Sequence, residues 1–132
     1  MPKLKALQLS QNPIGNQGVA ALAEPVGKLS RLKRLQLVDC EIGDEGVASL
    51  VANLGKDDFK ALELLSLHSN NDQYGNKITD VGVSKLVTCI DAGGLPNLGF
   101  GDNNQHHGFL FGNPVSTSAT LSLKDALDKR SR

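Results

Sequence analysis

Residues 32–50 read LKRLQLVDCEIGDEGVASL and contain one complete strand–helix unit. Leu35 and Leu37 are separated by one polar residue, so both side chains fall on one face of a short strand. From Val47 onward, apolar residues recur at the three- and four-residue spacing of an amphipathic helix. A unit this short cannot bury either apolar face by itself. It therefore needs neighbours of its own kind.

The same spacing of apolar residues occurs three more times in the chain. These copies start at Leu4, Leu62 and Leu95, and each has an asparagine at the position that Cys40 holds here. That residue should turn inward and bond to loop backbone, which predicts a buried ladder of Asn12, Cys40, Asn70 and Asn103. We expect parallel strands centred near 7–9, 35–37, 65–67 and 98–100, with helices starting near 17, 45, 80 and 118.

Each of the first three helices is expected to begin with the same short motif. Asn16, Asp44 and Asp80 hold matching positions and are good caps for the first turn of their own helices. Two residues after each cap stands a glycine, at 18, 46 and 82. Glycine weakens a helix, so its recurrence indicates close packing against a neighbour. We expect Thr117 or Ser118 to cap the last helix.

This long repeat with its helix resembles the ribonuclease-inhibitor-like class of leucine-rich repeats. The class includes ribonuclease inhibitor, Ran GTPase-activating protein and the repeat regions of NOD-like receptors, and the resemblance covers about residues 3–103. It implies an α/β fold, a leucine-rich-repeat solenoid shaped as a short horseshoe, with parallel strands on the concave face and helices on the convex face. We assign 1–132 to a single domain of about four repeats, at 4–31, 32–61, 62–94 and 95–130.

The resemblance also implies intracellular protein–protein recognition. We expect a protein-interaction module, or a fragment of a larger leucine-rich-repeat protein, with a protein partner of unknown identity. The alternative is a regulator of a small GTPase resembling the Ran GTPase-activating family. We expect no enzyme, because no catalytic constellation stands out, and neither a cofactor nor a metal site, because no cluster with metal-ligand spacing is present.

Composition narrows the classes of partner. The chain has 14 Lys and Arg against 14 Asp and Glu, whereas a nucleic-acid binder usually carries a basic surplus. No apolar run is long enough to span a membrane. The two cysteines, Cys40 and Cys89, are expected to be reduced, which suits a cytoplasmic location, although a disulfide between them is an alternative.

Two segments lengthen the third and fourth repeats. Six residues are inserted in the stretch 71–77, and about ten in 104–112, each read as following the inward asparagine. The two segments should then be neighbours on one edge of the solenoid. Tyr74, His106 and His107 lie in them and are predicted to contact the partner, because exposed rings often anchor interfaces. The alternative is that both are tolerated surface insertions, since lengthening a loop costs little.

The concave face supplies the other predicted partner-binding residues. Arg34, Gln36 and His68 point outward by alternation, although His68 can also be an ordinary solvated histidine. Residues 108–111 form either a loop, which we prefer, or an extra strand antiparallel to 97–101. We expect Phe109 and Phe111 to fold inward over the end of the core; the alternative is that both rings are exposed beside Tyr74 and the histidines and anchor the interface.

The first repeat starts at Leu4, with no polar capping unit before it. Stacked repeats need capped ends, and a bare edge strand is a template for pairing with another chain. We therefore expect either a piece of a longer solenoid or self-association through uncapped repeat edges.

Overall fold

A computed structural model of the chain describes residues 3–52, 54, 58–70, 73, 75–100 and 108–130. The elements in chain order are β1 (Ala6–Gln8), α1 (Gly15–Gly27), β2 (Arg34–Gln36), α2 (Asp44–Val51), β3 (Leu64–Ser66), α3 (Asp80–Asp91), the 3-10 helix η1 (Gly108–Leu110) and α4 (Thr117–Arg130). All four helices begin within two residues of their predicted starts.

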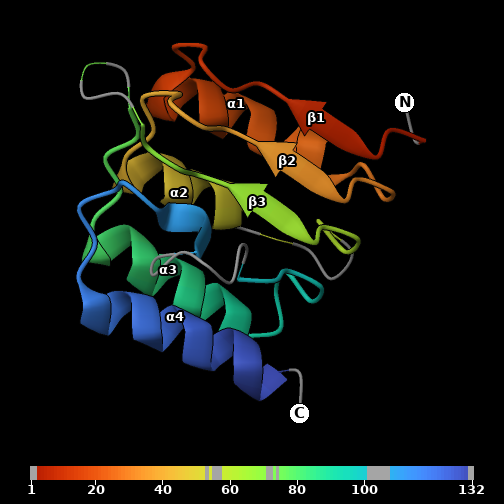
Figure 1. Cartoon of the computed structure of the whole chain (residues 1–132). Coiled ribbons are helices and arrows are strands. Elements are labelled where there is room, and N and C mark those ends of the chain that lie inside the picture. Colours follow the sequence, from red (N-terminus) through yellow and green to blue (C-terminus); the bar gives the residue numbers. More distant parts are fainter. Residues whose placement is uncertain are drawn as a thin grey trace.

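The described chain forms two layers. The three strands are parallel and lie in the order β1-β2-β3. Figure 1 shows the four helices side by side in chain order, with α1 and α2 behind the sheet and α3 and α4 continuing past β3. None of the described helices has the length and apolar character needed to cross a bilayer.

The core lies between the two layers. Leu35 and Leu65, the central residues of their strands, are 2% and 0% exposed. Val47 and Leu86, on the inner stripes of α2 and α3, are both 0% exposed. Burial of a leucine side chain contributes about 1.5–3 kcal/mol. The apolar faces that the spacing predicts are therefore the faces that hold the two layers together.

The predicted fourth strand at 98–100 is wrong, because these residues are described and are not a strand. Leu98 N–H donates to Leu95 O at 3.1 Å, just as Leu62 N–H donates to Phe59 O at 3.2 Å. Phe59 and Leu95 also share a left-handed φ, of 52° and 49°. The structural equivalent of Leu62 is thus Leu98 rather than Leu95. The residue that would then match the buried Leu65 is a glycine, which offers no side chain to the core.

The segment 108–111 takes over part of the missing strand's role. Phe100 O accepts a hydrogen bond from Phe109 N–H at 3.0 Å, so Phe109 lies beside Phe100. Leu67 N–H then donates to Phe109 O at 2.9 Å, and Ser69 N–H to Phe111 O at 2.9 Å. These bonds advance in the same direction along both segments. Residues 108–110 form the 3-10 helix η1, so the alternative of an extra strand antiparallel to 97–101 is wrong and the preferred non-strand conformation is confirmed.

The two sides of the sheet differ in how they are covered. Beside β3, Gly99 N–H donates to Glu63 O at 3.0 Å, and η1 covers the other end of the strand. β1 is the edge strand on the opposite side. Its central residue Leu7 is only partly buried, whereas Leu35 and Leu65 are fully buried. The apolar core is thus partly open beside β1.

Candidate protein-binding surface

The face of the sheet away from the helices brings several predicted site residues together. Arg34 and Gln36 flank the buried Leu35, and His68 follows the buried Leu67, so alternation turns their side chains outward. Arg34 is exposed, whereas Gln36 and His68 are half-buried. We call this the exposed sheet face, and its residues used below are Gln8, Arg34, Gln36, Val38, His68 and Phe111.

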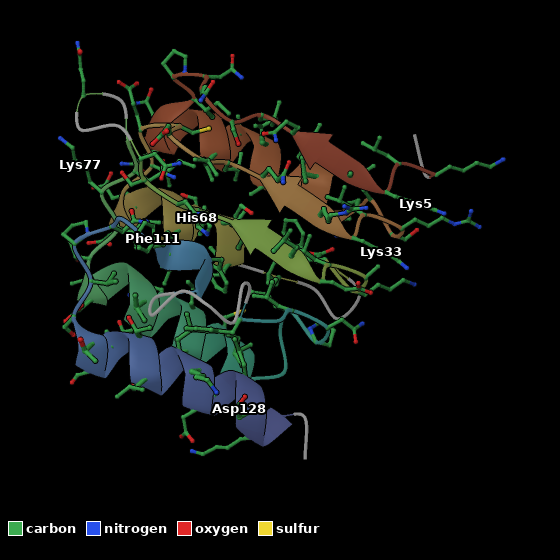
Figure 2. The ribbon with its side chains drawn as sticks, viewed as in Figure 1. Lys5, Lys33, His68, Lys77, Phe111 and Asp128 are labelled. Carbon is green, nitrogen blue, oxygen red and sulfur yellow. The ribbon has the colours of Figure 1, made fainter. Side chains whose placement is uncertain are left out.

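Backbone bonds align one row of this face across the units. Gln11 N–H donates to Val38 O at 2.8 Å, Asp39 N–H to His68 O at 3.2 Å, and Ser69 N–H to Phe111 O at 2.9 Å. Val38, His68 and Phe111 are therefore neighbours in successive units. The His68 and Phe111 rings meet edge to face, with centroids 6.4 Å apart and planes at 72°. Figure 2 shows the two side chains close together on this face.

Phe111 was predicted to fold inward, with an exposed contact position as the alternative. The expectation that both phenylalanines fold inward is confirmed for Phe109, which is 1% exposed, and wrong for Phe111, which is 43% exposed. A signal for this was present in the sequence. Residues 110–113 read LFGN and match 37–40, which read LVDC, so Phe111 takes the outward position of Val38.

A polar pair lies beside the aromatic pair. Gln8 Nε2 donates a hydrogen bond to Gln36 Oε1 across β1 and β2. Gln8 Oε1 in turn accepts from Ser10 N–H at 2.8 Å. The predicted contact residue Gln36 is therefore held in place by its neighbour, on a surface that combines amide groups, a guanidinium and one exposed ring.

The other predicted contact residues cannot be placed on this surface. Tyr74, His106 and His107 lie outside the described residues, as does Asn103 of the predicted ladder. The proposed cluster of rings on one edge is thus not described.

The inward ladder uses different asparagines from those predicted in the later units. Asn76 is 2% exposed, and its Oδ1 accepts from Cys40 N–H at 3.0 Å and Ile42 N–H at 2.9 Å. Its Nδ2 donates to Leu37 O at 2.8 Å and to Leu67 O at 3.2 Å. This one side chain therefore bonds to the chain just after β2 and just after β3, at Leu37 and Leu67, and also to the loop that follows Leu37.

Asn113 holds the same position in the last unit. Its Oδ1 accepts from Ile78 N–H at 3.0 Å, and its Nδ2 donates to Leu67 O at 2.7 Å. Asn70 is exposed, so its predicted ladder position is wrong, and only its backbone N–H bonds here, to Asp39 Oδ1 at 2.7 Å. The constant feature is the two-residue step from the ladder residue to Ile or Val, as in Asn76 to Ile78.

The earlier ladder predictions are only partly right. Cys40 is 0% exposed, with its Sγ 3.2 Å from Leu9 O, as the ladder requires. Burial raises the pKa of this thiol. Asn12 makes the expected bond, from Nδ2 to Leu9 O at 2.9 Å, but it is exposed. Exposure follows from its place in the first unit, beside the uncovered edge of the sheet.

The two lengthened segments do not occupy the same point of their units. The first lies between His68 and Asn76, before the ladder residue rather than after it. The second lies between Phe100 and Gly108 in the sequence, five residues or more before the ladder residue Asn113. The expectation that the two segments are equivalent is wrong. Spacing alone placed the first insertion after Asn70, but the ladder residue is Asn76, so the insertion precedes the ladder residue.

Each predicted cap acts on the following helix instead of its own. Asn16 Oδ1 accepts from Gly43 N–H at 2.8 Å and from Gly46 N–H at 2.9 Å, at the start of α2. Asp44 Oδ1 does the same at the start of α3, with Thr79 N–H at 2.8 Å and Gly82 N–H at 3.0 Å. These capping hydrogen bonds therefore link each unit to the next one.

The same arrangement continues at α4. Asp80 Oδ1 accepts from Ser116 N–H at 2.7 Å, and this bond lowers the pKa of the Asp80 carboxyl. The cap of α4 itself is Ser116, whose Oγ accepts from Ala119 N–H at 3.0 Å, rather than Thr117 or Ser118.

The recurring glycines leave room for these caps. A Cβ at Gly46 would lie 2.7 Å from Asn16 Oδ1, and a Cβ at Gly82 would lie 2.5 Å from Asp44 Oδ1. Close packing against a neighbouring helix is therefore confirmed at both positions.

Two further features concern possible chemistry. Cys40 and Cys89 are free thiols. Within the described ranges, no three His, Cys, Asp or Glu side chains come close enough to hold a metal ion.

Comparison with known proteins agrees with this arrangement. A family model described as "Leucine Rich repeat" matches residues 1–23, 29–51 and 75–87. The chain contains leucine-rich repeats. The third match begins at 75, beside the ladder residue Asn76, and spans the start of α3. No curated protein matches the chain.

A solved structure has a similar fold. It is "Leiomodin-1 Actin-Binding Site 2 (ABS2)", with a TM-score of 0.62 and 13% identity, covering 98% of this chain and 82% of that chain. At this identity the likeness shows the fold alone. Neither comparison supports the alternative of a small-GTPase regulator.

Proposed function

We propose that this chain is a protein-interaction module, a short solenoid of four ribonuclease-inhibitor-like repeats, which binds a protein partner on its exposed sheet face. The leucine-rich repeats support a protein-binding role, and so does the actin-binding segment with a similar fold. The observation that carries the choice of surface is Phe111, an exposed ring held edge-on against His68. Aromatic rings surrounded by polar groups are the usual anchors of protein interfaces.

The residues around this ring suit such a role. Arg34 supplies a guanidinium, and Gln8 and Gln36 supply amide groups that are already ordered by their mutual bond. Ordering before binding reduces the conformational entropy lost on association. Tyr74, His106 and His107, which lie outside the described residues, remain proposed contacts of the partner.

We propose further that the module acts by binding alone, without enzymatic activity, and that it works in the cytoplasm. The free thiols Cys40 and Cys89 are compatible with a reducing compartment.

Site-specific photo-crosslinking tests the proposed surface. A photoreactive residue at Val38, beside His68 on the exposed sheet face, is compared with one at Lys85, exposed on α3. Purified actin is the first defined probe, followed by a cytoplasmic extract. We expect crosslinked protein from position 38 and none from position 85, with Phe111→Ser removing the product. Equal products from both positions, or products insensitive to Phe111→Ser, would contradict the assignment of this face.

The open edge beside β1 supports a second proposal, that two copies of the chain associate there. Leu7 and Leu9 are only partly buried, whereas their equivalents Leu35 and Leu37 are each 2% exposed. A second chain would complete their burial and pair the unoccupied edge of β1. Sedimentation over a concentration series should show dimers that Ala6→Pro abolishes and Ala6→Ser retains, because proline blocks strand pairing. A monomer at every concentration would refute this.

A further inference from the structure

The charge of this neutral chain is unevenly distributed. Residues 1–40 hold six Lys and Arg but only two acidic residues, whereas 41–132 hold eight and twelve. The formal charge is therefore +4 in the first part and −4 in the second. Charge separated in this way creates a local field even when the total is zero.

The positive charge collects where the strands begin. Lys33 N–H donates to Lys5 O at 2.8 Å, so these two residues are neighbours on adjacent chain segments. Arg34 follows, in register with Ala6. Figure 2 shows Lys5 and Lys33 extending from the same end of the sheet, with Lys77 at the opposite end. We call this the basic patch, and its members are Lys3, Lys5, Arg31, Lys33, Arg34 and Lys60.

The basic patch is not neutralised by its surroundings. All six side chains are exposed, and none forms a salt bridge with another described residue. Lys28, nearby in sequence, does have a partner, Asp58 Oδ1 at 2.7 Å. Glu63 is the acidic residue beside Lys33 and makes no salt bridge within the described chain. A cluster of exposed cations without partners attracts an anionic ligand.

We propose that the basic patch binds an acidic segment of the protein partner, in extended conformation, with Asp or Glu at alternate positions. This rests on the proposed function and names the chemistry of the partner. Alternate residues of an extended peptide lie about 6.6 Å apart, and adjacent strands about 4.8 Å apart. Lys5 and Lys33 directly precede β1 and β2 and lie side by side, so two successive carboxylates on one side of such a segment can each meet one lysine.

The size of the patch favours a short peptide over a nucleic acid. The cations are confined to one end of the first two units, while the remaining chain carries the acidic surplus. A long polyanion that extends past the patch would meet this acidic remainder and be repelled. A short acidic segment would contact only the cations.

Fluorescence anisotropy with labelled peptides tests the proposal. The probes are Glu-Ser, Gln-Ser and Lys-Ser alternating octapeptides, and a single-stranded oligothymidine of the same charge as the first. We expect binding of the Glu-Ser peptide alone among the peptides, weakened by salt. Lys5→Gln/Lys33→Gln should weaken it about five-fold, the effect of two lost exposed ion pairs. The matched control, Lys77→Gln/Lys85→Gln, should change the affinity less than two-fold.

Three results would overturn the proposal. They are absence of binding at low salt, equal weakening in the control variant, and tighter binding of the oligothymidine than of the Glu-Ser peptide. Unchanged urea midpoints of both variants exclude misfolding as a cause. Crosslinking from Val38 that persists in Lys5→Gln/Lys33→Gln would preserve the proposed function while removing the acidic segment from it.

Discussion

The side-chain oxygen of Asn76 accepts a hydrogen bond from the backbone N–H of Cys40, 36 positions earlier, at 3.0 Å. Both residues are buried, at 2% and 0% exposure. The same oxygen serves Ile42 N–H, so a single amide satisfies two buried donors of the preceding unit. Buried donors without a partner cost free energy, and the contact therefore couples the stability of one unit to the next.

Replacing Asn76 by leucine should destabilise the protein strongly. The N–H groups of Cys40 and Ile42 would both be left unpaired, and we expect the free energy of unfolding to fall by about 3 kcal/mol. Urea denaturation measures this. The matched control is Asn70→Leu at the exposed neighbouring asparagine, which should change stability by less than about 0.5 kcal/mol. Equal losses in both variants would contradict the ladder assignment.

Asp44→Ala should loosen the start of α3 rather than that of α2. Asp44 accepts from Thr79 and Gly82 N–H, and loss of such a cap costs about 1 kcal/mol. Hydrogen exchange should speed up at Thr79 and Gly82 before it does so at Val47. The exposed neighbour Glu45 is the control, and Glu45→Ala should leave the exchange at α3 unchanged. Faster exchange confined to α2 would show that Asp44 caps its own helix.

Gly112→Ala should disrupt the contact between the last unit and β3. A Cβ at Gly112 would lie 1.9 Å from Ser69 O, and its φ is +87°. Gly93 provides the control, because its φ is +94° but nothing lies within 4 Å of its Cβ position. Gly93→Ala should cost about 1 kcal/mol for the left-handed backbone alone, and Gly112→Ala clearly more. Thermal unfolding of the two variants separates steric overlap from backbone preference.

The Cys40 thiol should make stability fall at alkaline pH. Burial raises its pKa in the folded state, so the folded protein holds the proton more tightly than the unfolded chain does. Its contribution is therefore complete below the unfolded thiol pKa of about 8.5 and is lost as pH rises toward the folded value. Urea denaturation between pH 7 and 10 measures this. Cys40→Ser should reduce the alkaline loss, and an unchanged loss in this variant would show that another group causes it.

The periodic parts of the structure could be read from the sequence. Alternation of Leu35 and Leu37 and the helical spacing after Val47 depend only on the geometry of a strand and a helix. They predict three strands and four helix starts correctly. Arg34, Gln36 and His68 were placed on the exposed sheet face for the same reason. These signals are local, so one unit contains all the information needed to recognise them.

Tertiary structure decided how the units are joined and where the fourth differs. Asn76 bonds to Cys40 and Asp44 to Thr79, each about 35 positions away. Counted forward from Leu67 the spacing selects Asn70, whereas counted back from Ile78 it selects Asn76, and the bonds in the assembled stack decide between the two. Because lengthening a loop costs little, the position of an insertion is set by which residue bonds best in the assembled stack. Phe111 reached the exposed sheet face in the same way, since its position follows from the bonds of the returning segment 108–111 to Leu67 and Ser69.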